Sequence, residues 1–159
     1  MPDASPAIMP TYGRLPVTFS RGEGAVLYDT NDRAYLDGVS GIAVTNLGHQ
    51  YPRVTQAVAE QASRLIHTSN LFHIGLQEAV AEQLRAATGM ENMFFCNSGA
   101  EANEAAIKLA RRYGDQKGIA FPQIIVLDGA FHGRTLGALS ATGNQKIRQG
   151  FGPLLEGFQ

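Results

Sequence analysis

A chain of 159 residues is long enough for one compact domain or for part of a larger protein. Its net charge of -1, without a segment rich in Lys and Arg, argues against a nucleic-acid-binding protein. The single cysteine excludes an internal disulfide, and no apolar run reaches the roughly 18 residues of a membrane-spanning helix. Because no secretion signal is visible, we expect a cytoplasmic protein that has no membrane segment.

Residues 1–45 are predicted to form an N-terminal arm and a small β meander, as part of a small domain. Four of the seven prolines lie within residues 1–16, which predicts an extended arm. Strand-like runs follow at residues 17–19, 25–28 and 34–36, and Gly, Asn and Asp residues separate them.

Residues 46–159 are predicted to form an incomplete α/β domain. Its first two helices are amphipathic. One begins near Pro52, where the missing N–H costs little, and reaches Leu65. The other runs from about residue 76 to 87 and ends before Gly89.

Apolar runs at residues 93–96 and 124–127 predict two short buried strands, each followed by a helical pattern. The alternation of apolar strands with helices indicates a parallel or mixed sheet that is covered on both faces. Cys96 ends the first run and is expected to be a small buried side chain rather than a catalytic thiol. On the helix after it, Glu104 and Lys108 have the spacing of an exposed ion pair.

The turn between the run 93–96 and its helix has the residues of an anion site. The segment 97–103 reads Asn-Ser-Gly-Ala-Glu-Ala-Asn. The first N–H groups of a helix lack partners within the helix, and the helix dipole adds positive charge there, so a phosphate binds readily. Gly99 would allow close approach of a ligand. Ser98 and Glu101 also fit a capping box, which needs no ligand.

A second loop, residues 129–134, follows the other predicted strand. If the two strands are parallel neighbours, both loops lie at the same edge of the sheet, where ligands bind in such folds. Phe131 could stack on a flat ring, and Arg134 could bind a carboxylate in bidentate fashion. Each also has a simpler explanation, as a core ring or a surface ion pair, and His132 is assigned no role. No His, Cys or Glu spacing indicates a metal site.

Several motifs in this order resemble the class III pyridoxal-phosphate aminotransferases, and most of all their acetylornithine branch. The motifs lie in residues 35–38, 41–49, 67–70, 97–104, 130–134 and 150–153. The resemblance implies the N-terminal part of a fold-type I transferase, with a mixed, mostly parallel sheet, helices on both faces and a preceding β meander. It also implies a homodimer whose substrates are small amino acids and 2-oxo acids, with no nucleic acid or membrane partner.

The resemblance implies pyridoxal 5'-phosphate as the cofactor. The turn Ser98, Gly99 and Ala100 would hold its phosphate, mainly through the backbone, and Phe131 would stack on its ring. Arg134 would bind the α-carboxylate of the substrate. Many relatives have Thr at the position of Ala100, so a hydroxyl is lost there while the backbone donor remains.

The Schiff-base lysine of this family lies in a later motif, and none of Lys108, Lys117 and Lys146 has that context. The chain is therefore expected to be the front portion of an enzyme that transfers an amino group from N-acetylornithine to 2-oxoglutarate in arginine biosynthesis. Taken alone it is expected to be inactive and to contain no catalytic residue. Succinylornithine, ornithine or 4-aminobutyrate as the amino donor remains open, as does a non-catalytic module that binds a phosphorylated ligand.

Overall fold

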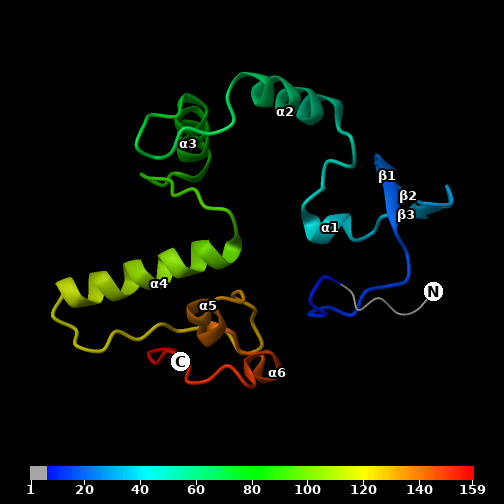
Figure 1. The fold of residues 1–159 in the computed structure, drawn as a ribbon. Coiled ribbons are helices and arrows are strands. Elements are labelled where there is room, and N and C mark those ends of the chain that lie inside the picture. The colour runs from blue at the N-terminus through cyan, green and yellow to red at the C-terminus, as the bar shows by residue number, and fades with distance from the viewer. Residues whose placement is uncertain (1–6) are drawn as a thin grey trace. The chain divides into compact units, whose positions relative to one another are not determined.

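The computed structural model describes residues 7–159, and residues 1–6 lie outside the described part. The chain divides into two compact units, one that ends at His73 and one that runs from Ile74 to Gln159 (Figure 1). The predicted extended arm falls partly outside the described residues, and residues 7–18 contain neither helix nor strand. The predicted domain division between residues 45 and 46 stays a prediction.

The first unit contains the predicted β meander. Its strands are β1 (Phe19–Glu23), β2 (Val26–Asp29) and β3 (Ala34–Leu36), which pair antiparallel in the order β1-β2-β3. The tight β1–β2 connection includes Gly24, whose φ of 52° is in the region that favours glycine. The third strand lies as predicted, the second is shifted by one residue toward the C-terminus, and the first begins two residues later than predicted and is longer.

A buried carboxylate closes the turn between β2 and β3. Asp29 is 2% exposed. Its Oδ1 accepts hydrogen bonds from the N–H groups of Asn31 (2.8 Å) and Arg33 (3.0 Å). Its Oδ2 accepts from Arg33 Nε (2.8 Å) and from the Tyr35 hydroxyl (3.2 Å). Burial acts to raise the pKa of Asp29, but these hydrogen bonds to the charged form outweigh burial and lower the pKa.

A second carboxylate, that of Asp37, ties the end of the meander to the segment beyond it. The Oδ2 atom of Asp37 lies 2.7 Å from His49 Nε2, while its Oδ1 accepts from the N–H of Ser40 (2.8 Å). The bond to His49 and then the bond from Ser40 lower the pKa of Asp37. The backbone of His49 also exchanges two hydrogen bonds with Gly24, so the segment after the meander is bound to the connection between β1 and β2.

The turn α1 (Ser40–Ala43) is left-handed, because all four of its residues have φ between 50° and 63°. Left-handed backbone is costly for residues with a Cβ, and Ile42 is β-branched. After it comes α2 (Pro52–Arg64), which begins at the predicted proline.

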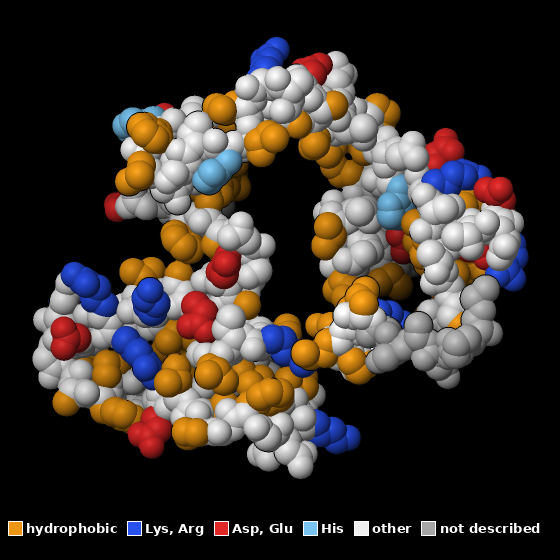
Figure 2. All heavy atoms as spheres, viewed as in Figure 1, with side chains coloured by type: hydrophobic (Ala, Val, Ile, Leu, Met, Phe, Trp, Pro, Cys, Tyr) orange, Lys and Arg blue, Asp and Glu red, His pale blue; other side chains and the backbone are white. Residues whose placement is uncertain are grey.

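The second unit begins with α3 (Gly75–Thr88), whose end is confirmed as predicted. Gly89 has φ of 73° and donates its N–H to the carbonyl of Arg85, as in a left-handed helix cap. The apolar stripe of α3 is not buried by described residues: Val80, for example, is 45% exposed. The space-filling view shows hydrophobic side chains on the surface of both units (Figure 2).

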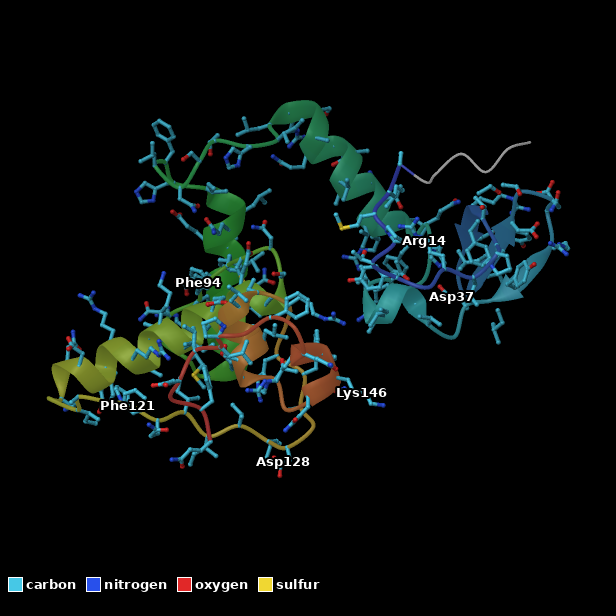
Figure 3. All side chains as sticks on the ribbon, turned by 60° about the horizontal axis from the view of Figure 1, so that its bottom comes forward. Arg14, Asp37, Phe94, Phe121, Asp128 and Lys146 are labelled. Atoms are coloured by element: carbon cyan, nitrogen blue, oxygen red, sulfur yellow. The ribbon has the colours of Figure 1, made fainter. Side chains whose placement is uncertain are left out.

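The rest of the second unit contains α4 (Gly99–Gln116), α5 (Leu136–Ala141) and α6 (Gln145–Arg148). The main buried cluster of the described residues lies here. Five successive residues of α5, Gly137 to Ala141, are buried, and Ile107 of α4 is 7% exposed. Both ribbon views place α5 against α4 (Figures 1 and 3), and the two helices are in contact.

The two predicted strands of this unit do not form as regular strands. Residues 93–96 have no β partner among the described residues, and Phe94 is 69% exposed. Residues 124–126 do begin a parallel pairing with 157–159, through an Ile124–Phe158 bridge and three backbone hydrogen bonds. The runs were correctly recognised as extended and apolar, but their burial was wrongly predicted, because no described layer covers them.

Candidate functional site

The N-terminus of α4 carries the predicted capping interaction. Ser98 has extended backbone angles, and its Oγ accepts the N–H of Glu101 at 3.2 Å. The Glu101 carboxylate turns back and accepts the N–H of Asn97 at 2.5 Å. In a standard capping box this second bond would reach the N–H of Ser98, so the box is displaced by one residue.

Capping leaves two donors available at the same turn. Within the described part of the chain, no hydrogen bond reaches the N–H of Gly99 or of Ala100. A Cβ built on Gly99 would meet no atom within 4 Å, so the space outside the turn is open. Two free N–H groups at the start of an 18-residue helix suit an anion, since the helix dipole favours negative charge there.

The second predicted loop lies against this turn. A Cβ built on Gly133 would be 2.7 Å from the Cβ of Ala100, a distance too short for a real contact. Gly133 has φ of 131°, which is a second reason for glycine at this position. The two loops that sequence reasoning placed at one edge of the sheet are therefore in direct contact.

Buried polar contacts close the loop at its base. The N–H of Gly143 donates to the carbonyl of Ala130 at 2.9 Å. The N–H of His132 donates to the Oγ1 of Thr142 at 3.1 Å, and this hydroxyl donates to the carbonyl of Ala138 at 3.0 Å. Thr142 is fully buried. Residues 130–143 thus form a loop whose two ends are bonded to each other.

Phe131 and Arg134 project from this loop. The Phe131 ring is 60% exposed, which leaves its surface available to a ligand rather than to a core. The guanidinium carbon of Arg134 lies 5.7 Å from the centre of this ring, within the range of a cation–π contact. Among residues 7–159, no carboxylate forms an ion pair with Arg134. Its charge is therefore free to bind a ligand anion.

Sequence reasoning missed two residues that join α4 to the loop. Asn103 donates its Nδ2 to the carbonyl of His132 at 2.6 Å. The Oε1 of Glu104 accepts hydrogen bonds from the Thr135 hydroxyl and from the N–H of Ala138, the latter at 3.2 Å. The predicted Glu104–Lys108 ion pair is wrong, because helical spacing identifies neighbours on one helix but not a partner 31 residues away.

Two further side chains near the site were not anticipated from the sequence, one because of its exposure and one because of an unpartnered buried nitrogen. Cys96 is exposed, so its predicted burial is wrong, and its thiol lies 3.4 Å from the carbonyl of Ser98. The Nδ1 atom of His132 is buried and has no hydrogen-bond partner within the described chain. No sequence signal distinguished this histidine from an ordinary loop residue.

All three lysines of the chain are exposed. Lys108 lies on α4, and Lys117 directly follows this helix and lies near the ring of Tyr113. Lys146 is on α6 (Figure 3). No hydrogen bond or ion pair of the described residues connects any of their ammonium groups to the 97–101 turn or the 129–134 loop.

No helix in the part of the chain that the structure describes is both long enough and apolar enough to cross a membrane.

The family model of the class III aminotransferases matches residues 7–159. The acetylornithine aminotransferase of Nitrosomonas europaea is 58% identical over 151 residues, which are 95% of this chain and 38% of the relative. The chain thus spans about two fifths of the length of this relative.

Solved structures give a matching result. The ornithine aminotransferase of Toxoplasma gondii ME49 superimposes with a TM-score of 0.91 at 31% identity, over 96% of this chain and 37% of that one. The N-acetylornithine aminotransferase of Stenotrophomonas maltophilia K279a has a TM-score of 0.71 at 43% identity, over 77% of this chain and 34% of that one. These likenesses confirm the predicted fold class, that of the fold-type I transferases with a small β meander.

Proposed function

This chain belongs to the class III aminotransferase family, and from that premise we propose that it is the N-terminal portion of a pyridoxal-phosphate-dependent transaminase. The proposed reaction transfers the amino group of N-acetylornithine to 2-oxoglutarate, as a step of arginine biosynthesis. The observation that carries the proposal is the contact between Gly133 and Ala100, which joins an anion-binding turn to a loop with an exposed ring and an unpaired guanidinium.

The choice of amino donor follows from the degree of likeness. The relative that is named an acetylornithine aminotransferase is 58% identical, whereas the structure that is named an ornithine aminotransferase is 31% identical. Acetylation removes the charge of the α-amino group and leaves the distal amino group for transfer, so the two donors need differently charged pockets around the α-carbon. Succinylornithine, ornithine and 4-aminobutyrate are the alternatives that kinetics must separate.

The residues of the α4 turn fit the phosphate of the proposed cofactor. The N–H groups of Gly99 and Ala100 have no partner among the described residues, and the space outside Gly99 is open. The Ser98 hydroxyl accepts the N–H of Glu101 and still has a proton to donate to a phosphate oxygen. Phe131, across the contact at Gly133, would lie against the face of the pyridine ring. When bound, the cofactor supplies the electron sink for the chemistry at the substrate carbon that carries the transferred amino group.

Arg134 is the proposed binding residue for the substrate's α-carboxylate. It lies three residues after Phe131 and is free of ion pairs within the described chain. A guanidinium binds a carboxylate through two parallel hydrogen bonds, which fix the substrate's orientation as well as its position. Both substrates carry an α-carboxylate, so the same residue would serve both half-reactions.

The lysine that binds the cofactor covalently is not one of the three in this chain. Lys108, Lys117 and Lys146 are exposed, and no hydrogen bond or ion pair of the described residues connects their ammonium groups to either loop of the candidate site. We therefore assign the covalent anchor to another part of the full-length protein. A cytoplasmic homodimer belongs to the same proposal.

The test is kinetic and uses the full-length protein. Purified enzyme with added pyridoxal phosphate is assayed with 2-oxoglutarate and each of the four candidate donors. We expect the highest kcat/KM with N-acetylornithine. A preference for another donor would overturn the substrate assignment, and absence of transamination with all four would overturn the proposed function.

The roles of the two loops are tested by Arg134→Ala. Loss of hydrogen bonds to a charged group should raise KM for both substrates about 10- to 100-fold, while cofactor affinity changes little. Arg112→Ala, at an exposed position of α4, is the matched control and should leave both quantities unchanged. Loss of cofactor with unchanged substrate KM would reverse the assignment of the two loops.

A further inference from the structure

Two adjacent residues of α4, Asn103 and Glu104, bind the chain on both sides of Arg134. The Asn103 amide holds the carbonyl of His132, two residues before Arg134. The Glu104 carboxylate holds the hydroxyl of Thr135, the residue directly after it. The two bonds span 29 and 31 residues of sequence, and both begin on the helix whose first turn forms the candidate phosphate site.

The Glu104 side chain does more than contact Thr135. The same oxygen, Oε1, accepts the N–H of Ala138 at 3.2 Å, a group in the first turn of α5 that has no carbonyl partner within that helix. The other oxygen, Oε2, lies where a side chain at Gly137 would be, because a Cβ built there would be 2.5 Å from it. Glycine at position 137 therefore leaves the room that the carboxylate occupies.

We propose that Asn103 and Glu104 are positioning residues that fix Arg134 at a set distance from the phosphate-binding turn. This inference rests on the proposed function, in which one end of α4 holds the cofactor phosphate and Arg134 holds the substrate carboxylate. A substrate carboxylate and a cofactor phosphate are bound at the same time, so the separation of their two binding groups decides where the reacting carbon of the substrate lies relative to the cofactor. Glu104 acts on the substrate only through the backbone next to Arg134.

The hydrogen bonds of Asn103 and of Glu104 are chemically distinct. Asn103 supplies a donor to a carbonyl, so a residue without an amide loses the bond. Glu104 supplies an acceptor to two donors, and a glutamine keeps one acceptor oxygen of the same reach. Gln at position 104 should therefore preserve the position of the loop, whereas Ala should release it.

The experiment compares Glu104→Ala, Glu104→Gln and Thr135→Val in the full-length holoenzyme. KM for the amino donor and for 2-oxoglutarate, kcat, the Kd of pyridoxal phosphate and the thermal midpoint are measured for each. Lys108→Ala is the matched control, one turn further along the same helix and exposed. It should leave all of these quantities at their wild-type values.

For Glu104→Ala we expect KM to rise about tenfold for both substrates, because a small misplacement of a binding group is costly. The Kd of the cofactor should change less than about twofold, since the α4 turn itself is intact. Glu104→Gln should restore KM to within about threefold of wild type. Thr135→Val removes one donor without touching α4 and should raise KM in the same direction, which keeps the test valid if Glu104→Ala does not fold.

Three outcomes would overturn the inference: unchanged KM in both Glu104→Ala and Thr135→Val, equal loss of cofactor and substrate affinity, or no rescue by Gln. Other outcomes would overturn the proposed function itself. If wild-type enzyme shows no transamination, or if Arg134→Ala leaves KM unchanged, the roles of the two loops are wrong. If wild type is active and Arg134→Ala raises KM while the Glu104 and Thr135 variants do not, only the positioning role of Asn103 and Glu104 is wrong.

Discussion

Each of the two units contains a carboxylate that accepts several hydrogen bonds, but the two carboxylates work over very different lengths of chain. Asp29 binds partners within six residues of itself and closes one turn of the meander. Glu104 binds groups 31 and 34 residues away and joins two helices. The first set of contacts is local and includes an ion pair with Arg33, whereas the second is long-range and its donors are a hydroxyl and a backbone N–H.

The difference has a thermodynamic consequence. A contact within a few residues closes a small loop, so little chain entropy is lost when it forms. The Glu104 contact must hold a loop of 31 residues, and it is accompanied by the buried cluster around Leu139 and Thr142. We therefore expect the meander to depend on its own hydrogen bonds, whereas the candidate site depends on close packing between distant segments.

Gly133→Ala should disrupt the long-range contact between the two loops of the candidate site, and we expect it to have the largest effect of the substitutions considered. The new Cβ would be 2.7 Å from that of Ala100, and φ of 131° strains any residue with a side chain. We expect a loss of about 2–4 kcal/mol in the free energy of unfolding and a marked loss of cofactor affinity. Denaturant unfolding and cofactor titration of the full-length protein measure the two effects.

Gly118→Ala is the control for backbone strain alone. Gly118 has φ of 72° and open space around its Cβ position, so its cost should be about 1–2 kcal/mol. Cofactor affinity should not change. Equal effects of the two substitutions on cofactor binding would contradict a tight contact between the two loops.

Asp29→Asn should weaken the local contacts of the turn between β2 and β3 and leave the candidate site intact. The amide offers one acceptor oxygen in place of two and loses the charge that Arg33 pairs with. We expect the thermal midpoint to fall by several degrees with substrate KM unchanged. Asp32→Asn, at a side chain that is 82% exposed, should have almost no effect. A rise in KM for Asp29→Asn would show that the meander influences the site.

Acid should weaken the meander by a smaller amount. The pKa values of Asp29 and Asp37 are both lower in the folded chain than the ordinary value of about 3.9. Their contribution to stability is therefore fully present above that value and is lost as the pH falls through the lower folded pKa values. Asp37→Asn should reduce this dependence on pH, because the amide does not titrate.

Hydrogen exchange resolved to peptides measures this last effect. In wild type, protection of the β1–β3 peptides should decrease below about pH 4. In Asp37→Asn the decrease should be shallower. An unchanged profile in the variant would mean that the Asp37–His49 contact does not contribute to the acid dependence.

Local features were predictable from sequence because a few residues determine them. Pro52 marks the start of α2, Gly89 the end of α3, and Ser98 the start of α4. The turn residues of the meander indicated its three strands nearly in their observed places. In each case the physical cause, a fixed φ, a left-handed cap or a side-chain acceptor, acts within one turn of the chain.

Long-range features were predicted only where a fold rule connected them. The rule that ligands bind beyond the carboxyl ends of parallel strands predicted that the 97–103 turn and the 129–134 loop lie together. Gly133 and Ala100 do lie in contact, although residues 93–96 and 124–127 do not pair with each other as strands in the described chain. The rule could not identify Glu104, because the partners of that carboxylate depend on how α5 approaches α4. The exposure of Cys96 was missed for a related reason, since an apolar run indicates burial only if another layer covers it.

The hydrogen bond between Gly143 and Ala130 joins the two ends of the loop formed by residues 130–143. A side chain at Gly143 would collide with the backbone nitrogen of Gly129, so the two ends of this loop approach too closely for any residue but glycine at position 143. Insertions and deletions next to Ala130 or Gly143 should therefore be poorly tolerated, since they would break the hydrogen bond that joins the two ends of the loop. The Gly143 amide should therefore exchange slowly with deuterium. Its exchange rate should match that of unfolding of the second unit and not that of local opening of a surface loop.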